Sequence, residues 1–120
     1  MTTTADAVVI GGGVMGASIL HSLTSKGVKN SILLERSTIG SGSTGRSSGA
    51  IRMHYSTEVN ARLALESLQI FANFDEIVGG DVGFVETGYM VFAPDNAREG
   101  FLANIEMQRS VGIDTRVISL

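Results

Sequence analysis

The sequence predicts an α/β fold built on a βαβ unit, and three neighbouring features support this prediction. A short run rich in β-branched residues, 7–10, is followed directly by a glycine-rich turn. Apolar residues at helical spacing fill 14–26, and a second apolar run occupies 31–35. A strand, a helix and a second strand within about 30 residues form a right-handed unit with parallel strands.

The boundaries of these three elements follow from the residues at their ends. The first strand is expected to end at Gly11, because its apolar run stops there. Gly27 is placed where a C-cap glycine ends a helix, so the helix is expected to stop at Lys26. The second strand ends in an acidic residue, Glu35.

The segment 37–48 is rich in Ser, Thr and Gly and contains no acidic residue. Arg36, Arg46 and Arg52 lie in it or beside it. Segments of this composition are often flexible linkers. Apolar, structured sequence on both sides and the three arginines favour a functional loop instead.

The second half of the chain is predicted to hold two helices, a β-hairpin between them and the start of a further strand. Apolar residues at three- and four-residue spacing indicate the helices, and apolar runs on both sides of Thr87 and Gly88 indicate the hairpin. In chain order, these elements are expected at 58–78, 84–93, 96–110 and 115–118. Residues suited to cap or end the helices are Thr57, Gly79, Gly80, Asp95 and Gly112.

Composition and charge limit the possible functions. The 120 residues are 43% hydrophobic, which suits one small globular domain, and the net charge of −3 argues against a nucleic-acid partner. The chain has no cysteine and only two separated histidines, so we expect no metal site. No apolar run reaches the about 20 residues that span a bilayer. Because the N-terminus also lacks the positive charge of a secretory signal, we expect a cytoplasmic protein.

Gly11, Gly13 and Gly16 form a G-x-G-x-x-G motif between the first predicted strand and the helix. The first glycine of such a motif permits a tight turn, the second lets a pyrophosphate approach the backbone, and the third allows close helix–strand packing. The N-terminal amides and the dipole of the helix then bind phosphate. Glu35 follows about 20 residues later, where an acidic residue binds the ribose diol. The motif therefore predicts a Rossmann-like dinucleotide site, against the alternative of a tight turn without a ligand.

The motif limits the choice of cofactor but does not identify one. A carboxylate at Glu35 disfavours a 2′-phosphate, so NADP is not expected, although Arg36 beside it is a counter-argument. NAD and FAD both carry an ADP half, and the motif does not separate them.

Four segments carry a resemblance to a known family: 11–16, 34–36, 42–52, and 87–90 with the helix after it. With these segments the chain resembles the D-amino-acid oxidase superfamily of flavoenzymes, in its sarcosine oxidase, glycine oxidase and dye-linked proline dehydrogenase branch. The resemblance covers essentially the whole chain. It implies that residues 1–120 are the N-terminal part of an FAD-binding oxidoreductase domain, an incomplete domain of a larger fold.

The resemblance implies FAD as the cofactor and assigns residues to it. Glu35 would bind the adenosine ribose, Arg36 would lie along the adenine, and Arg46 would sit close to the flavin. The full implied set of cofactor-binding residues is Gly11, Gly13, Val14, Met15, Gly16, Glu35, Arg36, Gly42, Ser43, Thr44, Arg46 and Ser47. No metal ligand is implied.

The resemblance also implies a substrate site. Arg52 matches the position that faces the substrate carboxylate in sarcosine-oxidase-like relatives, and a guanidinium pairs with a carboxylate in a bidentate manner. His54 and Tyr55 follow Arg52 and are expected to line the same pocket. The alternatives are an ion pair of Arg52 with a carboxylate such as Glu58, and a merely polar environment for His54. No residue is assigned a catalytic role.

The implied reaction is oxidation of a secondary amine or amino acid, such as sarcosine, glycine or proline, to an imine by hydride transfer to the flavin. The alternatives are another FAD-linked dehydrogenase, of the glycerol-3-phosphate or 2-hydroxyacid type, and a nucleotide-binding module without activity. Members of the family are several times longer, so we expect the 120 residues alone to be incomplete and inactive. The missing part would be the rest of the same chain or a partner subunit.

Overall fold

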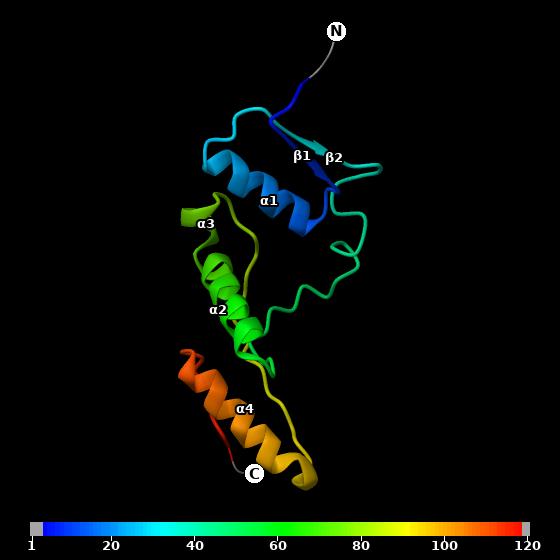
Figure 1. Ribbon diagram of the computed structural model, residues 1–120. Coiled ribbons are helices and arrows are strands. Elements are labelled where there is room, and N and C mark those ends of the chain that lie inside the picture. Colours follow the sequence, from blue (N-terminus) through cyan, green and yellow to red (C-terminus); the bar gives the residue numbers. More distant parts are fainter. Residues whose placement is uncertain (1–3, 119–120) are drawn as a thin grey trace. The chain divides into compact units, whose positions relative to one another are not determined.

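The computed structural model describes residues 4–118, which form two compact units with a boundary between Ala50 and Ile51. The first unit consists of β1 (Ala7–Ile10), α1 (Val14–Ser25), β2 (Ser31–Leu34) and the loop that follows (Figure 1). The second unit consists of α2 (Glu58–Ala72), α3 (Phe74–Ile77), the 3-10 helix η1 (Asp95–Ala97) and α4 (Arg98–Ser110).

The first unit is a parallel βαβ unit, as the sequence predicts. Its two strands pair in register from Ala7 opposite Ser31 to Ile10 opposite Leu34. The helix α1 ends one residue earlier than expected, and Gly27 follows with a φ of +91°. That left-handed conformation costs glycine little, and it turns the chain back toward β2.

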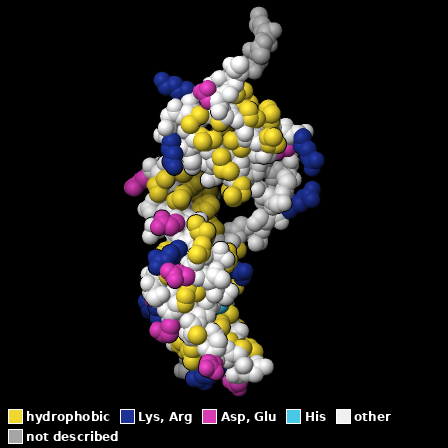
Figure 2. Space-filling model, in the orientation of Figure 1, with side chains coloured by type: hydrophobic (Ala, Val, Ile, Leu, Met, Phe, Trp, Pro, Cys, Tyr) yellow, Lys and Arg dark blue, Asp and Glu magenta, His cyan; other side chains and the backbone are white. Residues whose placement is uncertain are grey.

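One face of this small sheet is open to solvent. Successive strand residues point to opposite faces, and Val9 points toward Gly16 of α1. Val8 and Ile10 therefore point away from α1, and they are 53% and 85% exposed. Figure 2 shows hydrophobic side chains gathered on the surface of this unit. Soluble proteins rarely leave a sheet face of this kind bare, which suits a piece of a larger sheet.

The second unit has a small core at the contact between α2 and α4. Its buried members are Ala61, Val111 and Ile113, and Met53, Leu65 and Met107 pack against them from partly buried positions. Gly112, with a φ of +95°, ends α4 as the sequence predicts. The turn at Gly112 brings Val111 and Ile113 into the core next to α2.

The ends of the helices differ in detail from the expectation. The predicted helix over 58–78 is broken at Asn73, whose side-chain amide donates to the carbonyl oxygen of Gln69 at 2.9 Å. An asparagine that bonds locally to the backbone competes with continued helix formation. Thr57 occupies the N-cap of α2 without a side-chain bond, and Pro94 rather than Asp95 precedes η1.

Two expected β elements are not formed. The predicted hairpin over 84–93 is wrong, because the structure has no strand there. A tight two-residue hairpin turn needs a positive φ at its first central residue. Here Gly88 alone has one, at +73°, and β-branched Thr87 does not. Residues 115–118, where the sequence predicts the start of a further strand, also form no strand.

Candidate functional site

The first unit contains an open cavity of about 680 Å³ at the end of its parallel strands. Its walls come from the turn after β1, the first turn of α1, the end of β2 and the Ser/Gly/Arg loop. Ligands of open α/β sheets bind outside the carboxyl ends of the strands, which is where this cavity lies.

The cavity brings together nearly all residues that the sequence predicts to bind a cofactor. These residues are Gly11, Gly13, Val14, Met15, Gly16, Glu35, Arg36, Gly42, Ser43, Thr44 and Arg46. Ser47 is the exception: its amide donates to the Thr44 carbonyl at 3.2 Å and its hydroxyl accepts from the Gly49 amide at 3.1 Å. Ile10, Ser37 and Ser41 also line the cavity and are missing from the prediction. Each of these three residues is a direct sequence neighbour of a predicted residue, and this adjacency is the signal that could have identified them.

The turn after β1 requires glycine at two positions. Gly11 has a φ of +104°, and its amide donates to the carbonyl of Leu34 at 2.8 Å, which extends the ladder between the strands. Gly16 is buried, and a Cβ added there would collide with the carbonyl oxygen of Gly11. The helix can therefore approach the strand this closely only without a side chain at residue 16.

The Ser/Gly/Arg loop is fastened to the start of α1. Thr44 Oγ1 accepts a hydrogen bond from the Val14 amide at 2.9 Å, and the Gly40 amide donates to the Gly12 carbonyl at 2.9 Å. The next amides of the first turn, those of Met15 and Gly16, have no intrahelical carbonyl to bind. This turn itself contains no acidic residue, and the positive end of the helix dipole faces the cavity.

Glu35 is held by two backbone amides. Its Oε2 accepts from Gly12 at 2.7 Å and its Oε1 from Ser37 at 2.8 Å. These bonds, first the one from Gly12, lower the pKa of the Glu35 carboxyl below its ordinary value. A carboxylate oxygen has two lone pairs, so each oxygen can still accept one bond from a ligand hydroxyl.

The cavity also carries two arginines. Arg36 and Arg46 line it, and neither forms an ion pair within residues 4–118. With the amides of α1 and the hydroxyls of Ser43 and Thr44, they make a donor set that suits a phosphorylated ligand.

In the second unit, Arg52 lies with two tyrosines. Its Nη1 donates to Tyr89 Oη at 3.3 Å, and its guanidinium carbon lies 5.8 Å from the centre of the Tyr55 ring. The bond to Tyr89 raises the pKa of the Arg52 guanidinium above its ordinary value. Within residues 4–118 Arg52 forms no ion pair, and Glu58 pairs instead with Arg62 at 2.9 Å, so the alternative of an Arg52–Glu58 ion pair is wrong.

His54 faces a different neighbourhood from Arg52. Its ring packs against Phe101 at a centroid distance of 5.4 Å, and its Nδ1 lies 3.1 Å from Nε2 of Gln108. The structure thus brings Tyr55 to Arg52 and places His54 against α4. Sequence reasoning missed both Tyr89, which lies in one of the four segments of the family resemblance, and Gln108, which no pattern distinguishes.

Two kinds of feature are absent from the part of the chain that the structure describes. None of its helices combines the length and the apolar character needed to cross a bilayer. No three of its His, Asp or Glu side chains gather in a way that could hold a metal ion.

Comparison with known proteins gives consistent matches. Residues 6–120 match the family described as FAD dependent oxidoreductase (DAO). The 4-methylaminobutanoate oxidase (formaldehyde-forming) of Paenarthrobacter nicotinovorans is 33% identical over 86 residues, which cover 72% of this chain and 10% of that protein. The mitochondrial sarcosine dehydrogenase of Mus musculus is 28% identical over 121 residues, covering 99% of this chain and 13% of that protein.

A solved structure also matches almost the whole chain. The crystal structure of L-proline dehydrogenase from P. horikoshii superimposes with a TM-score of 0.87 at 33% identity, covering 99% of this chain and 31% of that one. The chain thus spans less than a third of each of these three proteins.

Proposed function

The chain belongs to the family of FAD-dependent oxidoreductases, and from this premise we propose that the cavity of the first unit binds FAD. The observation that carries the proposal is the convergence of three sequence segments on one cavity: the glycine turn, the end of β2 and the Ser/Gly/Arg loop. The glycine turn supplies backbone amides, the end of β2 supplies the Glu35 carboxylate, and the loop supplies hydroxyls and Arg46. These groups suit the phosphates and the ribose of a dinucleotide.

The residues present fit the ADP half of FAD. A Cβ at Gly13 would lie 3.0 Å from Thr44 Oγ1, so this glycine makes room for the loop beside the first turn of α1. The amides of that turn supply donors for a phosphate. Arg36 and Arg46 supply positive charge, and neither forms an ion pair within residues 4–118. Glu35 offers two acceptor positions for a ribose diol, and its negative charge disfavours a 2′-phosphate.

FAD, when bound, supplies the acceptor for a hydride from the substrate. The groups of this chain bind and orient the cofactor. Glu35 and the first turn of α1 hold the nucleotide, and the loop over 42–46 forms one wall of the cavity. Positioning of this kind accounts for much of the rate of hydride transfer. Because the chain spans only part of its relatives, we propose that the reaction needs further protein, from the same chain or a partner, and that the 120 residues alone are inactive.

The proposed substrate is a secondary amine or amino acid with a carboxylate, which is oxidised to an imine. The three related proteins are named for 4-methylaminobutanoate, sarcosine and L-proline, all of which carry a secondary amine and a carboxylate. Arg52 supports this choice, since it is exposed and bonds to a neutral phenol instead of a carboxylate. Its guanidinium keeps the donors that a bidentate carboxylate needs. Tyr55 and His54 remain predicted members of the substrate pocket.

Titration with FAD tests the first part of the proposal. We expect quenching of flavin fluorescence and a raised melting temperature in the 120-residue chain, because a ligand stabilises the folded state that binds it. We expect the same in the natural protein, meaning this chain together with the further protein that we propose the reaction needs. NADP serves as the control and is expected to have no effect. A natural protein that is purified without flavin and does not bind FAD would contradict the proposal.

Anaerobic reduction of the bound flavin tests the substrate class in the natural protein. We expect sarcosine, glycine or L-proline to bleach the flavin absorbance, and an Arg52→Met variant to need a much higher substrate concentration. Bleaching by glycerol 3-phosphate or by a 2-hydroxyacid, without bleaching by any amine, would replace the amine proposal by that alternative.

A further inference from the structure

Gln108 on α4 is the most buried polar side chain of the second unit, with 1% of its surface exposed. Its Nε2 donates to the carbonyl oxygen of Tyr55 at 3.2 Å and lies 3.1 Å from Nδ1 of His54. Its Oε1 accepts from the hydroxyl of Thr115 at 3.1 Å. All three bonds lead to segments outside α4, so the side chain joins the segment 54–55, the helix and the residues after it.

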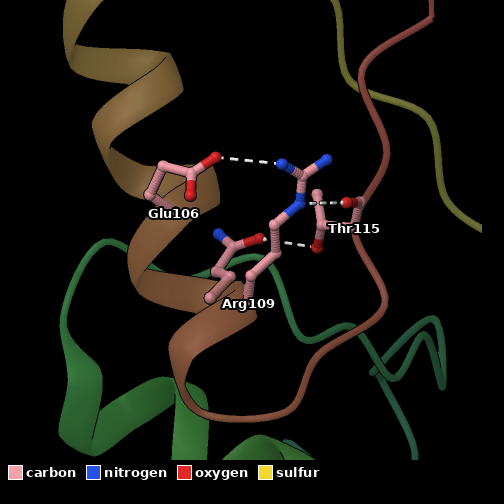
Figure 3. Close-up of polar contacts among 4 residues, drawn as sticks. Glu106, Arg109 and Thr115 are labelled. Atoms are coloured by element: carbon pink, nitrogen blue, oxygen red, sulfur yellow. Dashed lines mark hydrogen bonds and ion pairs between the residues drawn. The ribbon is translucent and has the colours of Figure 1, made fainter.

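Thr115 is itself held in place by the helix. The Nε of Arg109 donates to the carbonyl oxygen of Thr115 at 2.9 Å, and its Nη1 bonds to Glu106 at 2.9 Å (Figure 3). The acceptor side of the Gln108 amide therefore faces the hydroxyl of a residue whose backbone carbonyl is bonded to Arg109. A buried amide with all its partners in place holds one orientation, since rotation would leave buried polar atoms unpaired.

The carbonyl of Tyr55 decides which way the amide points. A carbonyl oxygen can only accept, so the atom of Gln108 that faces it must be the NH₂ group. A swap of the amide would set two acceptors against each other, whereas the Thr115 hydroxyl could serve either atom. The same NH₂ group faces His54, so Nδ1 of His54 must accept. A histidine that accepts at Nδ1 is neutral and carries its proton on Nε2.

We propose that Gln108 is a positioning residue for the substrate site: it holds His54 as the neutral Nε2–H tautomer and fixes the segment that carries Arg52. This rests on the proposed role of Arg52. The connection runs through Tyr55, whose carbonyl binds Gln108 and whose ring lies 5.8 Å from the Arg52 guanidinium. The Tyr55 amide also donates to the Met53 carbonyl at 3.0 Å, so the segment between them is a tight turn.

Nitrogen NMR of histidine-labelled natural protein, loaded with FAD, tests the tautomer directly. At about pH 8 we expect an unprotonated Nδ1 and a protonated Nε2 for His54. His21, the other histidine, is exposed on α1, and a His21→Asn variant assigns the signals. A protonated Nδ1 in the wild-type protein would overturn the proposal.

Gln108→Glu inverts the bond without changing the size of the side chain. A carboxylate can only accept, so we expect His54 to become protonated on Nδ1 in this variant. Gln69→Glu is the matched control, because Gln69 is exposed on α2. An unchanged His54 signal in Gln108→Glu would show that the bond is not formed in solution and would overturn the proposal.

Two further measurements distinguish a positioning role of Gln108 from a purely structural one. In Gln108→Leu we expect faster hydrogen exchange of the amides over 51–57 than in Gln69→Leu, a result that does not depend on any substrate. For the amine that bleaches the flavin, we expect KM to rise at least fivefold in Gln108→Leu with kcat changed less than twofold. Unchanged exchange and an unchanged KM would overturn the proposal. If no amine bleaches the flavin, the substrate proposal fails, while tautomer and exchange still decide the role of Gln108.

Discussion

The Gly12 amide donates to the Glu35 carboxylate at 2.7 Å, a bond that ties the turn after β1 to the end of β2. The carboxylate proposed to bind the ribose of FAD is therefore also part of the scaffold of its own cavity. Its second oxygen accepts from the Ser37 amide at 2.8 Å. Loss of the charge at this residue should affect both the ligand and the turn.

Glu35→Gln should weaken FAD binding by about tenfold or more, because hydrogen bonds to a charged acceptor are stronger than those to a neutral one. The amide replaces one acceptor oxygen with a donor that faces a backbone N–H. Fluorescence titration with FAD measures the effect, and Glu66→Gln, at an exposed residue of α2, serves as the control. Equal affinity in the wild type and Glu35→Gln would remove Glu35 from the site.

The lowered pKa of Glu35 predicts a specific loss of FAD binding in acid. A carboxyl whose folded-state pKa is depressed stabilises the fold above its unfolded-state pKa, and this contribution disappears as the pH falls through the folded value. Protonation of Glu35 would also remove the charged acceptor proposed for the ribose, so we expect wild-type affinity for FAD to persist through the ordinary glutamate pKa of about 4.3 and to fall at lower pH. The plot of FAD affinity against pH should be flatter for Glu35→Gln than for the wild type over the same range.

Asp114 provides the control for this pH dependence. Its pKa is also lowered, by the bond from Arg116 at 2.7 Å, but it lies in the second unit and outside the cavity. Asp114→Asn should therefore leave the pH profile of FAD affinity as in the wild type. A profile flattened equally by both substitutions would point to general acid unfolding.

Gly16→Ala should prevent the first unit from folding correctly, because the added Cβ would collide with the backbone carbonyl of Gly11. A backbone atom cannot move aside as a flexible side chain can. Gly100→Ala, in the exposed part of α4 with open space around it, is the matched control. It should raise stability by up to about 1 kcal/mol through helix propensity. Thermal melts and FAD titration of both variants check the contrast, and a fully stable, FAD-binding Gly16→Ala protein would contradict it.

Much of the fold of the first unit could be predicted from sequence, because its signals are local. The apolar runs, Gly11, Gly16 and Gly27 specify two strands and a helix within one continuous segment. The hairpin prediction failed at Thr87, since apolar runs do not reveal whether a partner strand is present or which φ the turn adopts. The break at Asn73 likewise depends on one side-chain bond.

The candidate site likewise contains residues that the sequence identified and residues that it did not. The glycine motif and Glu35 follow from spacing alone, and the loop over 42–46 from the family resemblance. Tyr89 and Gln108 are separated from Arg52 and His54 by 37 and 54 residues, so no local pattern joins them. Their roles depend on how the second unit folds, which a single sequence does not reveal.

Thr44→Val should loosen the loop from α1, and Thr44→Ser should not. Valine has the shape of threonine but lacks the hydroxyl that accepts from the Val14 amide at 2.9 Å. Loss of such a cap costs about 1 kcal/mol, so the melting temperature should fall by several degrees in the valine variant. FAD affinity should fall with it, because Gly42, Ser43 and Arg46 lie on the same loop and line the cavity. Calorimetry and FAD titration of the pair test this, and identical behaviour of the two variants would show that the hydroxyl does not hold the loop.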